Sequence, residues 1–201
     1  MKISILTFEG FNELDSLIAF GILSRVKKPD WQVSITSPTS QVCSMNGLVL
    51  EATKTLSDIA DDDVVLIGSG LKTREVVADE LLMAQLKLDP TRQLIGAQCS
   101  GALILEKLGL LKKMPVCTDL TTAPWVKETG VKVLDQAFYA EQNIASSGGC
   151  LASLYLACWV IARAEGLEEA KEQMHYFAPV GEKEAYVEAM VRNISPYLGK
   201  V

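Results

Sequence analysis

The residue with the clearest chemical potential is Cys99, which stands between two apolar runs in LIGAQCSGALILEKLGLL, residues 94–111. The first run is typical of a buried strand, and the second predicts a buried helix that begins at Ser100 or Gly101. Because a helix N-terminus favours a thiolate, we expect a lowered pKa for the Cys99 thiol. The small residues of this turn match a nucleophile elbow, in which the next N–H stabilises an oxyanion. The alternative is that Cys99 is a buried core side chain, as we expect for Cys158.

Asp15 is the acidic residue best placed to assist a thiol. The segment FNELDSLIAFGIL, residues 11–23, predicts a helix with Asn12 as its N-cap. The predicted buried face comprises Leu14, Leu17, Ile18, Gly21 and Ile22. Asp15 falls on the same face, where burial raises the pKa of a carboxyl group and suits it to general acid chemistry or to a hydrogen bond with a thiolate. The alternative is that Asp15 faces water in the first helical turn, although Glu13 fits that solvated position better.

A second turn of small residues, Gly68-Ser69-Gly70, follows the apolar run of DDDVVLIGSG, residues 61–70. Ligands bind at the carboxyl ends of strands in open parallel sheets, and glycines there let backbone amides approach a substrate. We therefore expect this turn and the Cys99 turn to line one site. Cys150, which follows Gly148-Gly149, is a further candidate for the same cleft.

The elements that must position these residues alternate between short apolar runs and longer stretches of helical period, which is typical of βα units. The predicted strands cover residues 3–8, 31–36, 64–67, 94–98 and 144–146. The predicted helices cover residues 13–26, 75–87, 101–111, 151–165, 168–176 and 182–193. Residues 41–52 predict a small hairpin with an Asn46-Gly47 turn, added to the main sheet. This order predicts a three-layer α/β sandwich, flavodoxin-like, with helices on both faces of a mostly parallel sheet, in one domain of residues 1–201.

Composition narrows the classes of partner. With 25 acidic and 19 basic residues, and no long cluster of Lys and Arg, the chain is not expected to bind nucleic acid. No apolar run is long enough for a membrane span, and the N-terminus lacks the pattern of a signal peptide. The five cysteines are widely spaced and the single His175 has no nearby cysteine, so we expect no metal site, no cofactor and a reducing, cytoplasmic location.

Taken together, the Leu14-Asp15 pair in the first helix, the Gly-Ser-Gly turn, and the Cys-Ser-Gly elbow with its ALILEKLGLL helix resemble the ThiJ/PfpI superfamily, relatives of class I glutamine amidotransferases. Within it the chain is most similar to isocyanide hydratases and to the amidotransferase-like domains of certain transcription regulators. The similarity continues through TTAPW, residues 121–125, and IASSGGCLASLYLACWVIARAEG, residues 144–166. The resemblance implies that Cys99 is the nucleophile and Asp15 its acidic partner. It places the amides of Gly70 and Ser100 around an oxyanion, and it implies a homodimer with the cleft near the interface. The expected substrate-lining residues are Gly68, Ser69, Thr121, Thr122 and Cys150.

One departure from the superfamily pattern bears on activity. Protease-like and amidotransferase-like members place a histidine near the cysteine, but here Ser100 follows Cys99 and the expected Thr-Thr-His-Trp stretch contains Ala123-Pro124 before Trp125. Only His175 is left to supply an imidazole, and a lone histidine is more often structural. The pattern therefore argues against a protease or a glutamine amidotransferase.

Three functions fit the remaining residues. The first is an enzyme acting on a small-molecule substrate, in which Cys99 attacks an electrophilic carbon and Asp15 moves the proton, with isocyanide hydration as the concrete form. The second is a non-enzymatic sensor or metabolite-binding protein whose Cys99 is oxidised. The third is a glyoxalase or deglycase activity of the kind found in some superfamily members, which the missing histidine disfavours.

Overall fold

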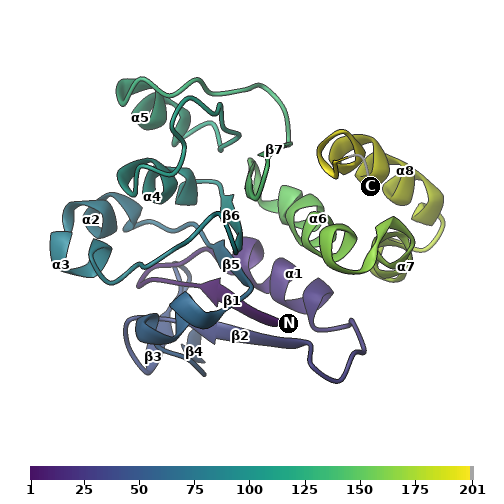
Figure 1. Cartoon of the computed structure of the whole chain (residues 1–201), viewed down its shortest axis with the longest axis horizontal. Helices are drawn as coiled ribbons and strands as arrows, with labels where there is room; N and C mark the ends of the chain where they lie inside the picture. Colours follow the sequence, from purple (N-terminus) through teal and green to yellow (C-terminus); the bar gives the residue numbers. More distant parts are fainter. Residues whose placement is uncertain (200–201) are drawn as a thin grey trace.

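The computed structural model of the chain, which describes residues 1–199, has a six-stranded sheet between two layers of helices (Figure 1). The strand order is β2-β1-β5-β6-β8-β7, and every neighbouring pair is parallel except β8 and β7. The strands are β1 (Lys2–Leu6), β2 (Gln32–Thr36), β5 (Val64–Ile67), β6 (Leu94–Gln98), β7 (Phe138–Glu141) and β8 (Ile144–Ser147). The predicted α/β fold with a mostly parallel sheet is confirmed.

The helices lie on both faces of the sheet and enclose two apolar cores (Figure 1). One face carries α1 (Glu13–Leu23), α6 (Ser153–Glu165), α7 (Leu167–Phe177) and α8 (Lys183–Ile194). The other carries α2 (Thr73–Ala78), α3 (Glu80–Met83), α4 (Gly101–Lys107) and α5 (Ala123–Glu128). The 3-10 helices are η1 (Leu56–Asp61), η2 (Cys150–Ala152) and η3 (Ser195–Tyr197). None of the helices between residues 1 and 199 is long and apolar enough to cross a membrane.

Several predicted helices differ from the observed ones at their ends. The predicted helix over residues 75–87 is broken at Asp79, whose extended backbone ends α2 and whose side chain caps α3. The helix predicted to run to residue 111 ends at Lys107, because Gly109 turns the chain with a φ of +68°. The prediction lacked helix α5, which carries Pro124 in its first turn, and the short edge strand β7. It also lacked the 3-10 helices η1 and η3.

The hairpin over residues 41–52 forms, but its predicted place in the main sheet is wrong. Strands β3 (Gln41–Cys43) and β4 (Val49–Glu51) pair antiparallel with one another as a separate two-stranded sheet. Gly47 has a φ of +91°, as a tight turn requires. The hairpin is held to the body by the carboxylate of Glu13, which accepts hydrogen bonds from Ser44 and Asn46 and whose pKa they lower. Glu13 is therefore an anchor for the hairpin.

The buried face of α1 also differs from the predicted one. Leu14 is 54% exposed, whereas Asp15 is only 2% exposed. The buried side chains of this helix are Asp15, Ser16, Ala19, Ile22 and Leu23. Asn12 is the N-cap, as predicted, and its side chain accepts a hydrogen bond from the N–H of Leu14. In the first turn of α1, the carboxyl group of Asp15 is therefore buried and the side chain of Leu14 is exposed.

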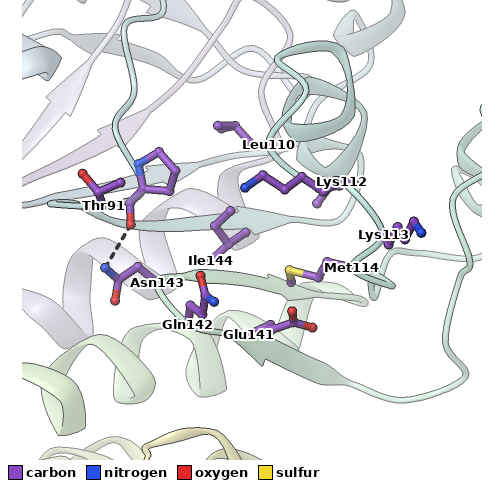
Figure 2. Close-up of a pocket in the computed structure, with 11 residues that line it drawn as sticks. Thr91, Leu110, Lys112, Lys113, Met114, Glu141, Gln142, Asn143 and Ile144 are labelled. Carbon is purple, nitrogen blue, oxygen red and sulfur yellow. Dashed lines mark hydrogen bonds between the residues drawn. The ribbon is translucent and has the colours of Figure 1, made fainter.

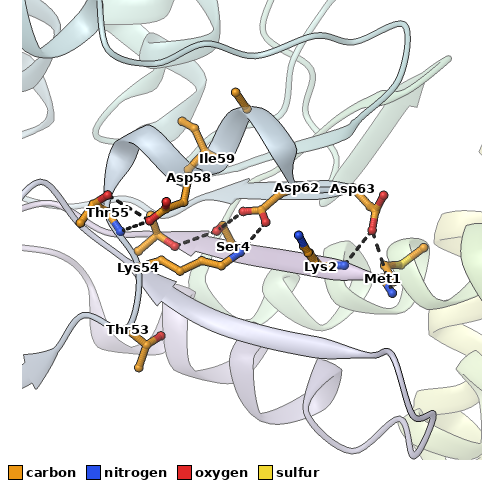
Figure 3. A network of polar contacts seen from close by, with 12 residues as sticks. Met1, Lys2, Ser4, Thr53, Lys54, Thr55, Asp58, Ile59, Asp62 and Asp63 are labelled. Atoms are coloured by element: carbon orange, nitrogen blue, oxygen red, sulfur yellow. Dashed lines mark hydrogen bonds and ion pairs between the residues drawn. The ribbon is translucent and has the colours of Figure 1, made fainter.

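A polar network connects the loop before β5 with the first strands of the sheet (Figure 3). The carboxylate of Asp62 is fully buried; it accepts a hydrogen bond of 2.5 Å from Ser4 and pairs with Lys54. Ser4 in turn shares a hydrogen bond of 2.7 Å with Thr36 on β2. The network therefore ties the loop before β5 to β1 and β2, and so helps to set the register of the sheet that carries the site.

We expect Asp62→Ala to lower the free energy of unfolding by about 3 kcal/mol, because it leaves the buried Ser4 hydroxyl and the Lys54 ammonium without their carboxylate. Urea unfolding followed by circular dichroism measures this loss. Asp61→Ala, at an exposed neighbouring position, is the matched control and is expected to change stability by less than about 0.5 kcal/mol. Equal stability of the two variants would contradict the role assigned to Asp62.

Candidate active site

Cys99 occupies a sharp turn between β6 and α4. Its φ is +46°, in the left-handed region that side chains rarely adopt, and its backbone is held by hydrogen bonds from its own N–H to Ser147 and from Thr118 to its carbonyl oxygen, both of 2.8 Å. Ser100 caps α4, which begins at Gly101 as predicted. A Cβ atom on Gly101 would lie 2.8 Å from the carbonyl oxygen of Ile67, so only glycine lets α4 start this close to β5. The geometry is that of a nucleophile elbow.

A cavity of about 290 Å³ lies over Cys99 at the carboxyl ends of the strands. Seven of the predicted site residues line it: Ser69, Gly70, Cys99, Ser100, Thr121, Thr122 and Cys150. Gly68 does not; it is buried against Ser16, whose hydroxyl oxygen would lie 2.6 Å from an added Cβ. Five further residues line the cavity and were not predicted from the sequence: Asn12, Met45, Leu71, Asp119 and Trp125. Trp125 lies on α5 and the other four lie outside the helices and strands, so only the position of Trp125 in the TTAPW stretch offered a signal.

The carboxyl group of Asp15 lies beneath the cavity. Its Oδ2 accepts a hydrogen bond from the Ser69 hydroxyl, while its Oδ1 is buried and has no hydrogen-bond partner of standard geometry. The thiols of Cys99 and Cys150 both lie close enough to this carboxyl group to influence its pKa. Burial raises the pKa of Asp15, and the contacts with Ser69 and the two thiols oppose that rise. Helix α1 thus brings a carboxyl group close to the thiols of Cys99 and Cys150.

The pKa of the Cys99 thiol is raised, so the expectation of a lowered pKa is wrong for the resting protein. Burial is the largest cause, and the negative charges of Asp15 and Asp119 add to it. The N–H of Gly149 opposes the rise by donating toward the sulfur. The Cys99 side chain is 4% exposed, and the amides at the start of α4 are not among the groups that oppose this rise. Cys99 therefore needs a base to become a nucleophile.

Ser100 and Gly70 are bonded to one another. The Ser100 hydroxyl accepts a hydrogen bond of 3.2 Å from the N–H of Gly70 and lies 2.7 Å from the hydroxyl of Thr73. The Gly70 amide, expected to face an oxyanion, is thus occupied in the resting site. The Ser100 hydroxyl holds the Gly68-Ser69-Gly70 turn against the elbow, and the Ser100 amide stands at the start of α4, where helical amides lack partners within the helix.

The single histidine, His175, lies outside the cavity over Cys99. His175 lies on α7, its side chain is 54% exposed, and its Nε2 is 3.9 Å from a carboxylate oxygen of Glu184. Between residues 1 and 199, no three His, Cys, Asp or Glu side chains are grouped closely enough to hold a metal ion. Asp15 is therefore the acid-base group that contacts the thiol.

Figure 2 shows a larger cavity, of about 810 Å³, elsewhere in the fold. It lies at the opposite edge of the sheet, before the starts of β6 and β8, where Asn143 donates a hydrogen bond of 3.0 Å to the carbonyl oxygen of Pro90. None of its lining residues is a cysteine or a histidine. Because ligands of parallel sheets bind at the carboxyl ends of the strands, the smaller cavity over Cys99 is the candidate site.

A model of the DJ-1/PfpI family matches residues 1–163, a range that contains Asp15, Cys99 and Cys150. The chain belongs to the DJ-1/PfpI family. The resemblance to the ThiJ/PfpI superfamily is thereby confirmed, although membership alone assigns no reaction. No curated protein matches the chain.

Solved structures of DJ-1/PfpI proteins share the fold at low identity. DJ-1 of Schizosaccharomyces pombe is 17% identical, with a TM-score of 0.75 over 89% of this chain and 100% of that one. A cysteine-to-alanine mutant of a DJ-1 superfamily protein from Salmonella typhimurium is 23% identical, with a TM-score of 0.76 over 89% and 98%. A ThiJ/PfpI family protein from Pseudomonas syringae is 19% identical, with a TM-score of 0.75 over 96% and 87%.

We expect Asp15→Asn to stabilise the protein in a pH-dependent way. Because the pKa of Asp15 is raised above its ordinary value of 3.8, wild-type folding stability falls as the pH rises through the folded pKa, and asparagine removes that loss. The melting temperature of Asp15→Asn should exceed that of wild type at about pH 7, by roughly 2–4 °C for each ~1 kcal/mol gained, and the gain should shrink toward about pH 4.

Glu13→Gln is the matched control. Hydrogen bonds lower the pKa of Glu13, so its ionised form stabilises the folded protein and the expected change in melting temperature has the opposite sign. Its melting temperature should fall below that of wild type at neutral pH, and the difference should fade as the pH is lowered. Thermal unfolding at a series of pH values measures both variants. A stability difference between Asp15→Asn and wild type that does not vary with pH would contradict the raised pKa of Asp15.

Proposed function

We propose that the protein is a cysteine-dependent enzyme that adds water to a small uncharged molecule, with hydration of an isocyanide to an N-substituted formamide as the concrete reaction. The observation that carries the proposal is the buried Oδ1 of Asp15, which lacks a hydrogen-bond partner in a carboxyl group that the Cys99 thiol contacts. A carboxyl group with a raised pKa is suited both to accept a proton and to return it near neutral pH.

The proposed reaction begins as Oδ1 of Asp15 takes the proton of the Cys99 thiol. The sulfur attacks the terminal carbon of the isocyanide, and that carbon then receives the proton from Asp15, which gives a thioimidate bonded to Cys99. Water adds to the same carbon while Asp15 accepts a proton from it and passes that proton to the nitrogen, which gives a tetrahedral adduct. The carbon–sulfur bond then breaks as Asp15 transfers the hydroxyl proton of the adduct to the departing sulfur, so that the formamide leaves and the thiol is restored.

The backbone around the elbow supplies the remaining contacts of this proposal. We assign the Ser100 amide to the negative charge that develops on the substrate. In the resting site the Gly70 amide donates to the Ser100 hydroxyl, which also lies 2.7 Å from the Thr73 hydroxyl. We propose that the Ser100 hydroxyl rotates to bond to Thr73 alone, so that the Gly70 amide becomes free to contact the same negative charge. Peptide or glutamine hydrolysis is disfavoured, because protonation of an amine leaving group commonly relies on an imidazole and His175 lies outside the cavity.

The charges around the cavity support a neutral substrate. None of its lining residues is Lys, Arg or His, whereas Asp119 lines it and Asp15 lies beneath it. An anion would therefore meet like charges with no cation to offset them. Met45, Leu71 and Trp125 supply apolar surface for a hydrocarbon substituent.

Steady-state kinetics with an aryl isocyanide test the mechanism, with formation of the N-aryl formamide as the readout. We expect Cys99→Ala to abolish turnover, and Asp15→Asn to lower kcat by about 100-fold or more, since it removes the proton-transfer group. Cys43→Ser, a cysteine outside the cavity, is the matched control and should retain wild-type rates. Undiminished turnover in both site variants would refute the mechanism, and turnover of methylglyoxal in place of the isocyanide would favour the glyoxalase alternative.

We also propose that the protein forms a homodimer through an apolar rim around the cavity, consisting of Leu14, Met45, Leu48, Leu71 and Leu151. Leu71 is 70% exposed and Leu151 is 65% exposed. A group of large apolar side chains exposed together often marks an interaction surface. Their segments are neighbours, because Met45 donates to Phe11, Leu71 donates to Gly10, and α1 packs against η2. A second copy that covers the rim would place the cavity near the interface, as the family resemblance implies.

Sedimentation velocity tests the dimer. We expect wild type to sediment as a dimer at micromolar concentration and Leu48→Glu to sediment as a monomer, because the charge would be buried in the interface. Leu81→Glu is the matched control, since Leu81 is also exposed but lies on α3, away from the rim. A monomeric wild type, or a dimer that survives Leu48→Glu, would contradict this interface.

The cytoplasmic location stays a prediction. All five cysteines are free in the structure, which is consistent with a reducing compartment. Three of them, Cys99, Cys117 and Cys158, are buried, and Cys43 and Cys150 are partly exposed.

A further inference from the structure

Cys150 is a second thiol in the cavity that the proposed hydration does not use. It begins η2, directly after Gly149, and it lines the cavity together with Cys99. The side-chain amide of Asn12 lies 3.3 Å from its sulfur and donates to it. The same Asn12 side chain caps α1 through its oxygen, so the position of the Cys150 sulfur is set by the helix that carries Asp15.

Both thiols converge on one carboxyl group. Cys99 and Cys150 each contact Asp15, whose Oδ1 is buried without another partner. The backbone next to Cys150 also meets Cys99, because the N–H of Gly149 donates toward the Cys99 sulfur. In addition, the side-chain amide of Gln98 lies 3.0 Å from the Gly149 oxygen and 3.8 Å from the Cys99 sulfur. Two cysteines far apart in the sequence are thus neighbours around one acid.

The other cysteines are not placed for this contact. The Cys43 thiol faces the carbonyl oxygen of Ser44, and the Cys158 thiol is fully buried within α6, against the carbonyl oxygen of Ala170. Cys117 is fully buried, with its N–H bonded to Ser146. None of these three lines the cavity.

We propose that Cys150 is the resolving thiol for Cys99, so that a hydroperoxide entering the cavity converts the pair into a reversible Cys99–Cys150 disulfide. This inference concerns the same cavity as the hydration but does not depend on it. The oxidant is a hydroperoxide, and the reductant that reverses the reaction is an external thiol. Formation of the disulfide requires rotation of the partly exposed Cys150 side chain toward Cys99, to the S–S separation of about 2.05 Å of a disulfide.

The oxidation proceeds in two balanced steps. Asp15 accepts the proton of Cys99, whose sulfur attacks one oxygen of the hydroperoxide; the O–O bond breaks, and the alcohol leaves with a proton while Cys99 becomes a sulfenic acid. The sulfur of Cys150 then attacks the Cys99 sulfur, the S–O bond breaks, and the hydroxyl leaves as water with the proton of Cys150, relayed by Asp15. Two thiols lose two electrons, and the hydroperoxide is reduced to alcohol and water.

The consequence is protection of Cys99. A sulfenic acid with no thiol nearby is oxidised further to sulfinic acid, which ordinary thiol reductants do not reverse. A disulfide with Cys150 stops the oxidation at a stage that a dithiol reduces. The oxidant thus removes the free Cys99 thiol from the cavity, and the reductant restores it.

Intact-protein mass spectrometry and peptide mapping under non-reducing conditions test the proposal, after treatment of the full chain with equimolar tert-butyl hydroperoxide. Wild type should lose two hydrogen atoms, yield a linked Cys99–Cys150 peptide pair, and recover its mass with dithiothreitol. Cys150→Ser should instead gain two oxygen atoms on Cys99 on further addition of peroxide, and dithiothreitol should not remove them. Cys43→Ser is the matched control and should form the disulfide as wild type does.

A wild-type protein whose Cys99 becomes sulfinic acid while Cys150 stays a free thiol would overturn the proposal, as would a disulfide between other cysteines. Circular dichroism of Cys150→Ser checks that the variant is folded, and Cys150→Ala provides a second variant in which the same sulfinic product is expected. Because the readout is the mass of the protein, with no isocyanide present, failure of the disulfide and failure of the hydration are separate results.

Discussion

The chemistry proposed for this protein depends on one buried carboxyl group. Asp15 is carried into the interior by the first turn of α1, which Asn12 caps, and it meets Ser69 and two thiols in place of water. An ionised carboxylate in such a place is costly. Burial raises the pKa of Asp15, of Cys99 and of Cys150, and the negative charge of Asp15 adds to the rise for both thiols. The proposed reactions therefore rest on proton transfer between this carboxyl group and the thiols.

The framework around Asp15 keeps the thiols in place. Cys99 holds a left-handed backbone that its hydrogen bonds to Ser147 and Thr118 stabilise, and Gly101 allows α4 to begin against β5. The strained backbone thus lies at the proposed nucleophile, and folded proteins often concentrate such strain at functional sites. The sheet beneath is fixed by cores on both faces, so the loops at the carboxyl ends of its strands converge on one cavity.

Most of the architecture was predictable because its signals are local. The strands β5 and β6 match the predicted ranges, since continuous apolar runs of four or five residues are typical of strands covered on both faces. The helix break at Asp79 and the end of α4 at Lys107 were not predicted. The helical spacing of apolar residues continues through both places, but the Asp79 side chain caps a new helix and Gly109 turns the chain after α4. Strand β7 and helix α5 were missed because their short segments carry little pattern of their own. The prediction of one domain over residues 1–201 stays a prediction.

The sequence by itself determined the fold class, the elbow at Cys99 and the presence of an acid on α1, because periodicity, small residues and a cap act within a few residues along the chain. Only the tertiary structure decided that Leu14 faces outward while Asp15 faces inward, and that Asn12, Asp119 and Trp125 join the cavity. It also decided the direction of the Cys99 pKa, because burial and the negative charges of Asp15 and Asp119 raise it. These are long-range effects of packing and electrostatics, and they arise only when separate loops are brought to one edge of the sheet.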